Sequence, residues 1–292
     1  MKCEAMYKLK NQFPVVKMCE ALKIQPASYY RWINQEQRRK TKRIQEQLLI
    51  NRVERVFLES DKTYGYRAMH KELLSEGISI SEYKVRKLMK ENGFYPETTT
   101  KYKPYHNGKT EGKYRTNRLK QDFKTELPGK VLAGDITYIK TKLGWVYLAV
   151  VVDLFNREIV GYSLSKKIDT ELVKRALVNS LGKISKTEEI VFHSDRGCQY
   201  SSKSFQELLE EHNIQGSMSR PGCPYDNSCV ESFFATLKKE RIYRRDYVGE
   251  EDLRKDMFKY IELFYNRKRR HSYLGYMSPV EYRMEYERKK SA

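Results

Sequence analysis

The chain has 292 residues, of which 39% are hydrophobic and 12% aromatic, a composition that allows a packed domain of medium length with smaller modules beside it. No run approaches the roughly 20 apolar residues of a membrane-spanning helix, and the charged opening residues lack the apolar stretch of a secretory signal, so we expect a cytoplasmic protein. The 57 Lys and Arg outweigh the 38 Asp and Glu and give a formal charge of +19, which attracts polyanions such as nucleic acid, although ribosomal and membrane-surface proteins share this property.

The positive charge is concentrated toward the amino end, since residues 1–120 hold 27 Lys or Arg and only 13 Asp or Glu. Within this part, residues 1–36 are predicted to form two short helices around a turn at Gln25-Pro26, with Ser28 capping the second. This arrangement resembles a helix-turn-helix, in which Tyr29 and Arg31 would contact DNA. An ordinary helical hairpin is the alternative.

A second helical unit is predicted over residues 37–94. A long polar helix runs from Arg38 to about Ser60, a second helix opens at Tyr64-Gly-Tyr-Arg67, and a third starts at Ser81. The basic side chains expected on its exposed surface are Arg67, Lys84, Arg86 and Lys87. They are candidate DNA contacts, and an ordinary solvated face is the alternative.

Residues 95–122 are predicted to form a basic linker, because they combine Thr, Lys, Tyr, Gly and Asn with two prolines and no sustained apolar period. Tyrosines alternate with Lys and Arg along this stretch. Such alternation suits base stacking and phosphate contacts along DNA, and a flexible tether of the same composition remains the alternative.

Beyond Lys130 the pattern changes to that of an α/β domain, predicted over residues 123–245. Three strands, at residues 131–140, 145–153 and 158–163, are expected to form an antiparallel meander. A helix at 170–181, a strand at 189–193, a helix at 202–212, a strand at 214–218 and a helix at 228–241 follow. The order βββαβαβα predicts a mixed sheet, and residues 246–292 are expected to add a helix over 251–264 and a basic tail.

Three acidic residues stand in positions that ordinary structural acids avoid. Asp135 lies within the first strand, Asp195 follows the fourth strand, and Glu231 lies in the helix after a Gly- and Pro-rich loop. Their oxygen atoms suit two Mg²⁺ ions, with Mn²⁺ as a substitute, in a phosphodiester reaction. Lys238, seven residues after Glu231 on the same helix face, is a candidate for holding a DNA phosphate. Taken singly, these residues also fit surface charges and a turn.

The spacing of these acids matches a known pattern, because 35 residues lie between Asp195 and Glu231. The sequence resembles the DD35E integrase core that retroviral integrases share with many insertion-sequence transposases. The segments that carry the resemblance are Val150 to Gly161, His193 to Tyr200, Asp226 to Phe234 and Tyr265 to Pro279. Together they look like the second-frame (OrfB) transposase of two-frame insertion sequences.

The resemblance implies a ribonuclease H-like core and a reaction in which element ends are hydrolysed and the freed 3′-hydroxyl attacks another phosphodiester. It implies binding to terminal inverted repeats and target DNA, a homo-oligomer in a synaptic complex on the bacterial nucleoid, and a first-frame (OrfA) product as a partner. Asn227 would order the active-site loop near the DNA, Asp153 would be structural, and His271 is a weaker candidate DNA contact. A nuclease of the same fold and a non-catalytic DNA-binding regulator are the rival functions.

Overall fold

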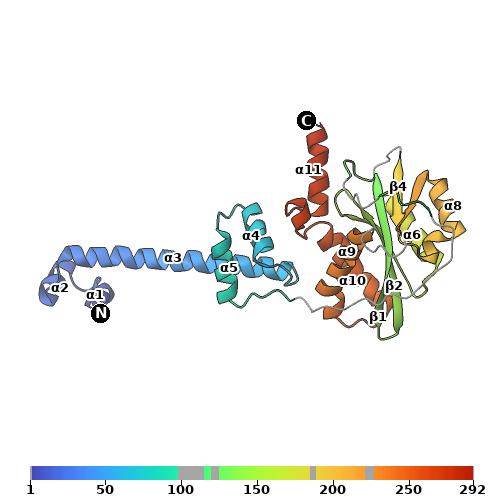
Figure 1. Cartoon of the computed structure of the whole chain (residues 1–292). Coiled ribbons are helices and arrows are strands. Elements are labelled where there is room, and N and C mark those ends of the chain that lie inside the picture. The colour runs from blue at the N-terminus through green and yellow to red at the C-terminus, as the bar shows by residue number, and fades with distance from the viewer. Residues whose placement is uncertain (1, 98–114, 120–124, 185–188, 221–226, 292) are drawn as a thin grey trace. The chain divides into compact units, whose positions relative to one another are not determined.

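The computed structural model describes residues 2–97, 115–119, 125–184, 189–220 and 227–291 (Figure 1). The chain divides into two compact units, Met1–Tyr95 and Pro96–Ala292. Within the described ranges no helix combines the length and the hydropathy that crossing a membrane requires. Most of the predicted basic linker falls on residues 98–114 and 120–124, which lie outside these ranges.

The first unit is helical throughout its regular structure. Its helices are α1 (Lys2–Leu9), α2 (Val15–Leu22), α3 (Pro26–Glu59), α4 (Tyr66–Ser75) and α5 (Glu82–Glu91). The start of α3 packs with α1 and α2 around Met6, Met18, Cys19 and Tyr29. The end of α3 packs with α4, and α4 packs with α5. These three helices bury apolar side chains at helical spacing, among them Val53, Phe57, Met69, Leu73, Val85 and Leu88.

The helix α3 corrects two predictions at the amino end. It is one helix of 34 residues, so the prediction of a short helix within residues 1–36 and a separate long helix from Arg38 is wrong, and the division between residues 36 and 37 falls inside α3. The reason is that no Gly or Pro interrupts α3 after its first residue, and Lys, Arg, Gln and Glu favour helix in its middle. Ser28 is not the cap either, because Gln25 takes that place and Pro26 occupies the first helical position. The helix α1 was not predicted.

The predicted second and third helices of this unit are confirmed as α4 and α5. The Ser81 hydroxyl accepts a hydrogen bond from Lys84 N at 3.3 Å and caps α5. Gly77 and Gly93 follow the two helices with φ of +80° and +72°, the left-handed conformation that glycine adopts without a steric penalty.

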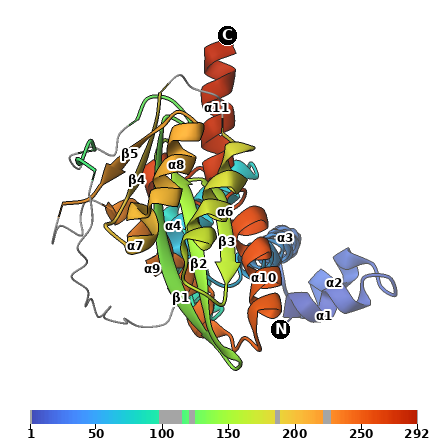
Figure 2. The same cartoon turned by 90° about the vertical axis from the view of Figure 1, so that its right-hand side faces the viewer.

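The second unit is built on a five-stranded mixed sheet (Figure 2). The strands are β1 (Val131–Thr141), β2 (Gly144–Asp153), β3 (Ile159–Ser165), β4 (Ile190–Ser194) and β5 (Ile214–Met218), in the spatial order β3-β2-β1-β4-β5. The first three strands are antiparallel, and β4 and β5 run parallel to β1. The predicted order βββαβαβα and the antiparallel meander are confirmed.

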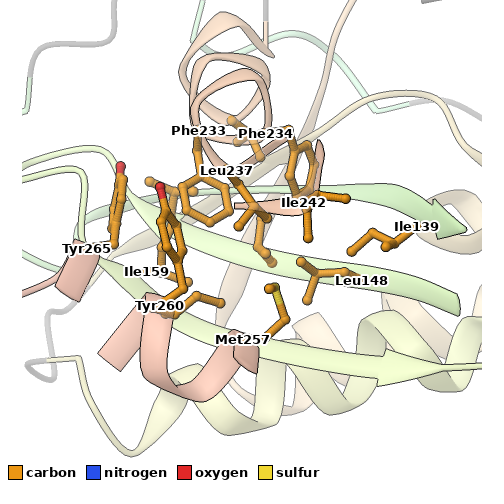
Figure 3. Close-up of a cluster of buried hydrophobic side chains, with 14 of the residues drawn as sticks. Ile139, Leu148, Ile159, Phe233, Phe234, Leu237, Ile242, Met257, Tyr260 and Tyr265 are labelled. Atoms are coloured by element: carbon orange, nitrogen blue, oxygen red, sulfur yellow. The ribbon is translucent and has the colours of Figure 1, made fainter. Parts of the chain in front are cut away.

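Helices cover both faces of the sheet. On one face α6 (Thr170–Leu181) and α8 (Lys203–Glu211) pack against Leu132, Ala149 and Val151. On the other, α9 (Ser228–Glu240) and α10 (Glu250–Phe258) bury Phe233, Leu237 and Met257 against Ile139 and Leu148 (Figure 3). Each such fully buried side chain contributes about 1.5–3 kcal/mol to folding. The strands are therefore held between two apolar layers, which fixes the positions of residues at their ends.

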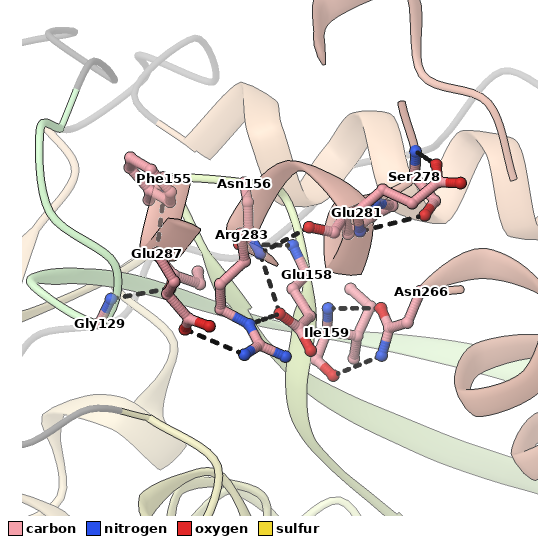
Figure 4. Close-up of polar contacts among 12 residues, drawn as sticks. Gly129, Phe155, Asn156, Glu158, Ile159, Asn266, Ser278, Glu281, Arg283 and Glu287 are labelled. Carbon is pink, nitrogen blue, oxygen red and sulfur yellow. Dashed lines mark hydrogen bonds and ion pairs between the residues drawn. The ribbon is translucent and has the colours of Figure 1, made fainter. Parts of the chain in front are cut away.

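The carboxyl-terminal region contains more helix than predicted. The helix α10 continues as the π-helix η3 (Lys259–Tyr265), and the expected basic tail contains α11 (Pro279–Ser291). Polar contacts to the turn between β2 and β3 hold α11 in place (Figure 4): Asn156 Nδ2 donates to Pro279 O at 3.0 Å, and Arg283 Nε donates to Glu158 Oε2 at 3.0 Å. The sequence of α11 is polar and lacks the apolar periodicity that predicts a helix, because these tertiary contacts hold the helix in place.

Asp153 ends β2 and has a structural role, as predicted. Its carboxylate accepts hydrogen bonds from Gly129 N at 2.8 Å and from Phe155 N at 2.9 Å, and the side chain is buried. Burial raises the pKa of Asp153 to about 6, against the lowering effect of these two backbone donors.

This raised pKa makes the stability of the second unit depend on pH. The folded state holds the Asp153 proton more tightly than the unfolded state. The protonated carboxyl therefore stabilises the fold fully below about pH 4, and this stabilisation is lost as pH rises through 6. Between low and high pH, the free energy of unfolding should fall by about 3 kcal/mol because of this group. Asp153→Asn should remove this component. Urea unfolding from pH 4 to 8, followed through Trp145 in a Trp32→Phe background, measures it. Asp246→Asn, at an exposed position, is the control. Identical pH profiles for wild type and Asp153→Asn would contradict the expectation.

Candidate active site

Asp135 lies on β1, half-buried, and Ile136 N donates a hydrogen bond to its Oδ1 at 2.7 Å. Strand alternation places Asp135 on the same face as Ala133 and Ile139, which pack against α9. Gly134 just before it lets β4 approach closely, because a Cβ at this position would lie 2.5 Å from Phe192 Cζ. The local sequence therefore brings the end of β4 beside Asp135.

Asp195 follows Ser194, the last residue of β4, and Gly134 on β1 is the strand partner of Ser194. The Asp195 side chain is exposed, and Gly197 N donates to its Oδ1 at 2.9 Å, so Asp195 also shapes the turn, as the simpler interpretation held. His193 two residues earlier is buried, with Nδ1 2.9 Å from Ser217 Oγ and Nε2 3.1 Å from Ser219 Oγ. His193 thus joins the end of β4 to β5 and to the residue that follows it.

Glu231 lies exposed in the first turn of α9. Asn227 precedes this helix and is buried, and its Nδ2 donates to Gly134 O at 3.4 Å. The start of α9 is therefore tied to the backbone directly beside Asp135.

Asp195 and Glu231 both act electrostatically on Asp135. The pKa of Asp135 is well above its usual range, first because the fold desolvates its carboxylate and then because of the charges of Asp195 and, to a smaller extent, Glu231. The Lys238 ammonium opposes these two charges, while burial lowers the pKa of Lys238 itself. The fold thus brings together Asp135, Asp195, Glu231 and Lys238 from β1, the end of β4 and α9.

The chemistry of this cluster fits a hard divalent cation, since carboxylate oxygens are the preferred ligands of Mg²⁺ and Mn²⁺. A carboxyl group whose pKa is raised by burial and like charges is also one that a cation would stabilise in its ionised form. Across the described ranges, no three His, Cys, Asp or Glu side chains lie close enough together to hold an ion. The carboxylates are neighbours and do not form a closed cage.

Two tyrosines near the cluster were missed. Tyr200 is buried in the short helix α7 (Cys198–Ser201), and burial together with the charges of Asp135 and Asp195 raises its pKa. Tyr138 is on β1, with the Lys238 ammonium 5.2 Å from its ring centroid. The sequence signal for Tyr200 is its place in the segment His193 to Tyr200, whereas nothing local distinguishes Tyr138.

The candidate DNA contacts of the first unit are mostly exposed. The guanidinium groups of Arg67 and Arg86 lie 5.5 and 5.7 Å from the ring centroid of Tyr66, so α4 and α5 share one basic surface. Lys84 and Lys87 are exposed on α5, and Arg31 is exposed on α3.

The prediction that Tyr29 contacts DNA is wrong. Tyr29 is 1% exposed and packs beside Trp32 in the core of α1, α2 and α3, so it does not reach solvent. Its neighbour Tyr30 is exposed instead, because the face of α3 that meets α1 and α2 includes residue 29.

Comparisons with known proteins agree with this architecture. Family models described as integrase core domains match residues 125–224 and 212–279, and one described as an HTH-like domain matches residues 44–102. A solved structure of the HTLV-2 integrase catalytic core domain in complex with magnesium is 19% identical, with a TM-score of 0.41, and covers 53% of this chain and 97% of that one.

Curated relatives match over much more of the chain. It is 36% identical over 282 residues to transposase InsF for insertion sequence IS3A of Escherichia coli (strain K12), which covers 97% of this chain and 98% of the relative. It is 40% identical over 240 residues to the transposase for insertion sequence element IS904 of Lactococcus lactis subsp. lactis (strain IL1403), which covers 82% of this chain and 94% of the relative. With an integrase core of ribonuclease H-like topology and this identity along almost its whole length, the chain belongs to the family of IS3-type insertion-sequence transposases.

Proposed function

We propose that this chain catalyses DNA transposition, in which it cleaves the ends of an insertion sequence and joins the freed 3′ end to target DNA. The observation that carries the proposal is the electrostatic cluster in which Asp195 and Glu231, from two other elements, both act on Asp135. A site this rich in carboxylates serves phosphodiester chemistry through bound cations. The identity to named transposases along nearly the whole chain supports the same reaction.

The three carboxylates would hold two Mg²⁺ ions, or Mn²⁺ in their place. Bound there, such ions supply charge that activates the attacking oxygen and stabilises the leaving oxygen. Asn227 keeps the start of α9 against β1 and thereby keeps Glu231 near Asp135. Lys238 is placed to hold a substrate phosphate, since its charge acts on Asp135 and it follows Glu231 by two helical turns.

The first unit would bind the terminal inverted repeats. Arg67 and Arg86 share the basic surface around Tyr66, Lys84 and Lys87 are exposed on α5, and exposed Arg31 on α3 adds a further phosphate contact. Binding should therefore weaken steeply with salt, because each neutralised phosphate releases counterions.

The assembly that carries out the reaction would be a homo-oligomer. Joining two element ends to one target requires more than one active site, and so several copies of this chain in a synaptic complex on the bacterial nucleoid. A first-frame product is the proposed partner for recognition of the ends.

The test is an assay with the purified chain, a labelled duplex that carries the element end, and Mg²⁺ or Mn²⁺. We expect metal-dependent nicks at the element end and labelled products longer than the substrate, which only joining produces. A duplex with a scrambled end and a reaction with EDTA are the controls. Free ends without joined strands would instead indicate a nuclease. Tight, salt-sensitive binding without any cleavage would indicate a regulator and would overturn the proposal.

A further inference from the structure

Two exposed aromatic rings lie together on the hairpin of β1 and β2. Tyr138 on β1 is 42% exposed and Trp145 on β2 is 50% exposed, with ring centroids 5.5 Å apart and planes at 79°. The strand register pairs Tyr138 with Tyr147 and Lys140 with Trp145, so the two rings are diagonal neighbours on one face of the hairpin. Exposed apolar side chains scattered singly are common on proteins, whereas exposed apolar side chains that form a continuous patch are a feature of interaction sites.

A lysine joins this pair to the active site. The Lys238 ammonium lies 5.2 Å from the ring centroid of Tyr138, and its charge also acts on Asp135. Lys238 comes from α9, which packs on the face of the sheet where Asp135 lies, whereas Tyr138 alternates onto the other face. In the described structure β4 pairs with β1 only along Val131–Gly134, so the edge of β1 beyond Gly134 is where Lys238 meets Tyr138.

The backbone that carries the rings is held firmly. Lys142 N donates to Tyr247 O at 2.9 Å, and Leu143 N donates to Val248 O at 3.0 Å, which fastens the tip of the hairpin to the segment after α9. Within the hairpin, the Thr141 hydroxyl donates to Gly144 O at 2.7 Å. A ligand that stacks on these rings therefore loses little free energy to ordering the backbone.

The chemistry around the rings favours a nucleotide over a protein. Lys140 and Lys142 are exposed on the same hairpin, and Lys238 lies over Tyr138. Flat aromatic faces beside lysines suit a base stacked on the rings with its phosphate near a cation. Protein interfaces are depleted in lysine at their centres, so the three lysines argue against a second protein as the occupant.

We propose that Tyr138 and Trp145 form a stacking platform for an unpaired base at the end of the element DNA, next to the phosphate held by Lys238. The proposal rests on the proposed function and adds to it the nucleotide subsite beside the cluster. A base inside a duplex exposes neither face, so the platform acts on a base that has left its pair. Stacking then offsets the unpairing cost of that base during cleavage and joining.

The test compares ring-preserving with ring-removing substitutions in the joining assay. Tyr138→Leu and Trp145→Leu should each reduce kcat/KM on a fully paired end by about 10-fold or more, whereas Tyr138→Phe and Trp145→Phe should stay within about 2-fold of wild type. An end with a mismatched terminal pair, which needs less unpairing, should recover part of the loss. Tyr243→Ala, which removes an equally exposed tyrosine, should leave joining unchanged.

Each failure has a distinct meaning. A wild-type chain that joins no ends defeats the proposed function, whereas equal joining by wild type and the leucine variants defeats only the platform. A mismatch that gives no recovery shows that the rings do not act on an unpaired base and overturns the proposal. So does a change in oligomeric state of the DNA-free leucine variants, measured by light scattering, because the rings would then form an interface between copies. Thermal unfolding of each variant confirms that it is folded.

Discussion

Asp135→Asn, Asp195→Asn and Glu231→Gln should each reduce both cleavage and joining by more than about 100-fold, the loss that follows when even a group that only orients a metal ligand is removed. Each substitution keeps the size of the side chain and removes its charge, so the acidic cluster loses one of the charges that would hold the ions. The affinity for element-end DNA should stay within about 3-fold, because the proposed phosphate contacts lie on other residues. Cleavage and joining assays at several Mg²⁺ concentrations measure the first effect, and a salt-controlled binding assay measures the second.

Glu207→Gln is the matched control, because this glutamate is exposed on α8, away from the three acidic residues in sequence, and pairs with Lys203 on the same helix. It should retain full activity. Undiminished joining by any one of the three variants would remove that residue from the proposed site. A loss of DNA binding equal to the loss of joining would show that the residue serves binding and not the reaction.

Glu240→Ala should destabilise the second unit by about 3–5 kcal/mol, because it leaves a buried guanidinium without its anion. Glu240 ends α9 and is buried, and Arg269 Nη2 donates to its Oε1 at 2.7 Å. The Tyr260 hydroxyl donates to the other oxygen, Oε2, at 2.8 Å. These bonds attach the helix that carries Glu231 to the π-helix η3 and the segment after it, so the substitution should also lower joining at temperatures where the chain remains folded.

Urea unfolding followed through Trp145 in the Trp32→Phe background measures this loss of stability. The double variant Glu240→Met with Arg269→Met should recover much of it, because well-packed apolar side chains replace a buried ion pair at little cost. A stability of Glu240→Ala within about 0.5 kcal/mol of wild type would show that solvent reaches Arg269 and compensates its charge.

Much of the core could be predicted because its signals are local. The strands β1 and β2 alternate or cluster apolar residues, and the predicted bounds at Val131 and Asp153 coincide with those observed. The 35 residues between Asp195 and Glu231 indicated the kind of site without any knowledge of the tertiary structure. The three acids also lie on the elements expected for them.

The wrong predictions share one cause: a sequence pattern does not show which other element packs against a given side chain. Tyr29 and Tyr30 are adjacent and chemically alike, and only the packing of α1 and α2 on α3 decides that Tyr29 is buried and Tyr30 exposed. The helix α11 has no apolar stripe of its own, and Asn156 and Glu158 hold it from more than a hundred residues away in sequence.

The three acidic residues show where the two sources of information divide. The sequence by itself determined that Asp135, Asp195 and Glu231 lie on a strand, after a strand and on a helix, because apolar periodicity and breaker residues act over a few neighbours. Only the tertiary structure decided that burial and Asp195 raise the pKa of Asp135, and that the Lys238 ammonium acts on Asp135 and lies 5.2 Å from the centroid of the Tyr138 ring. Those relations depend on strand register and on how α9 packs across the sheet, which arise from contacts between residues far apart in the chain.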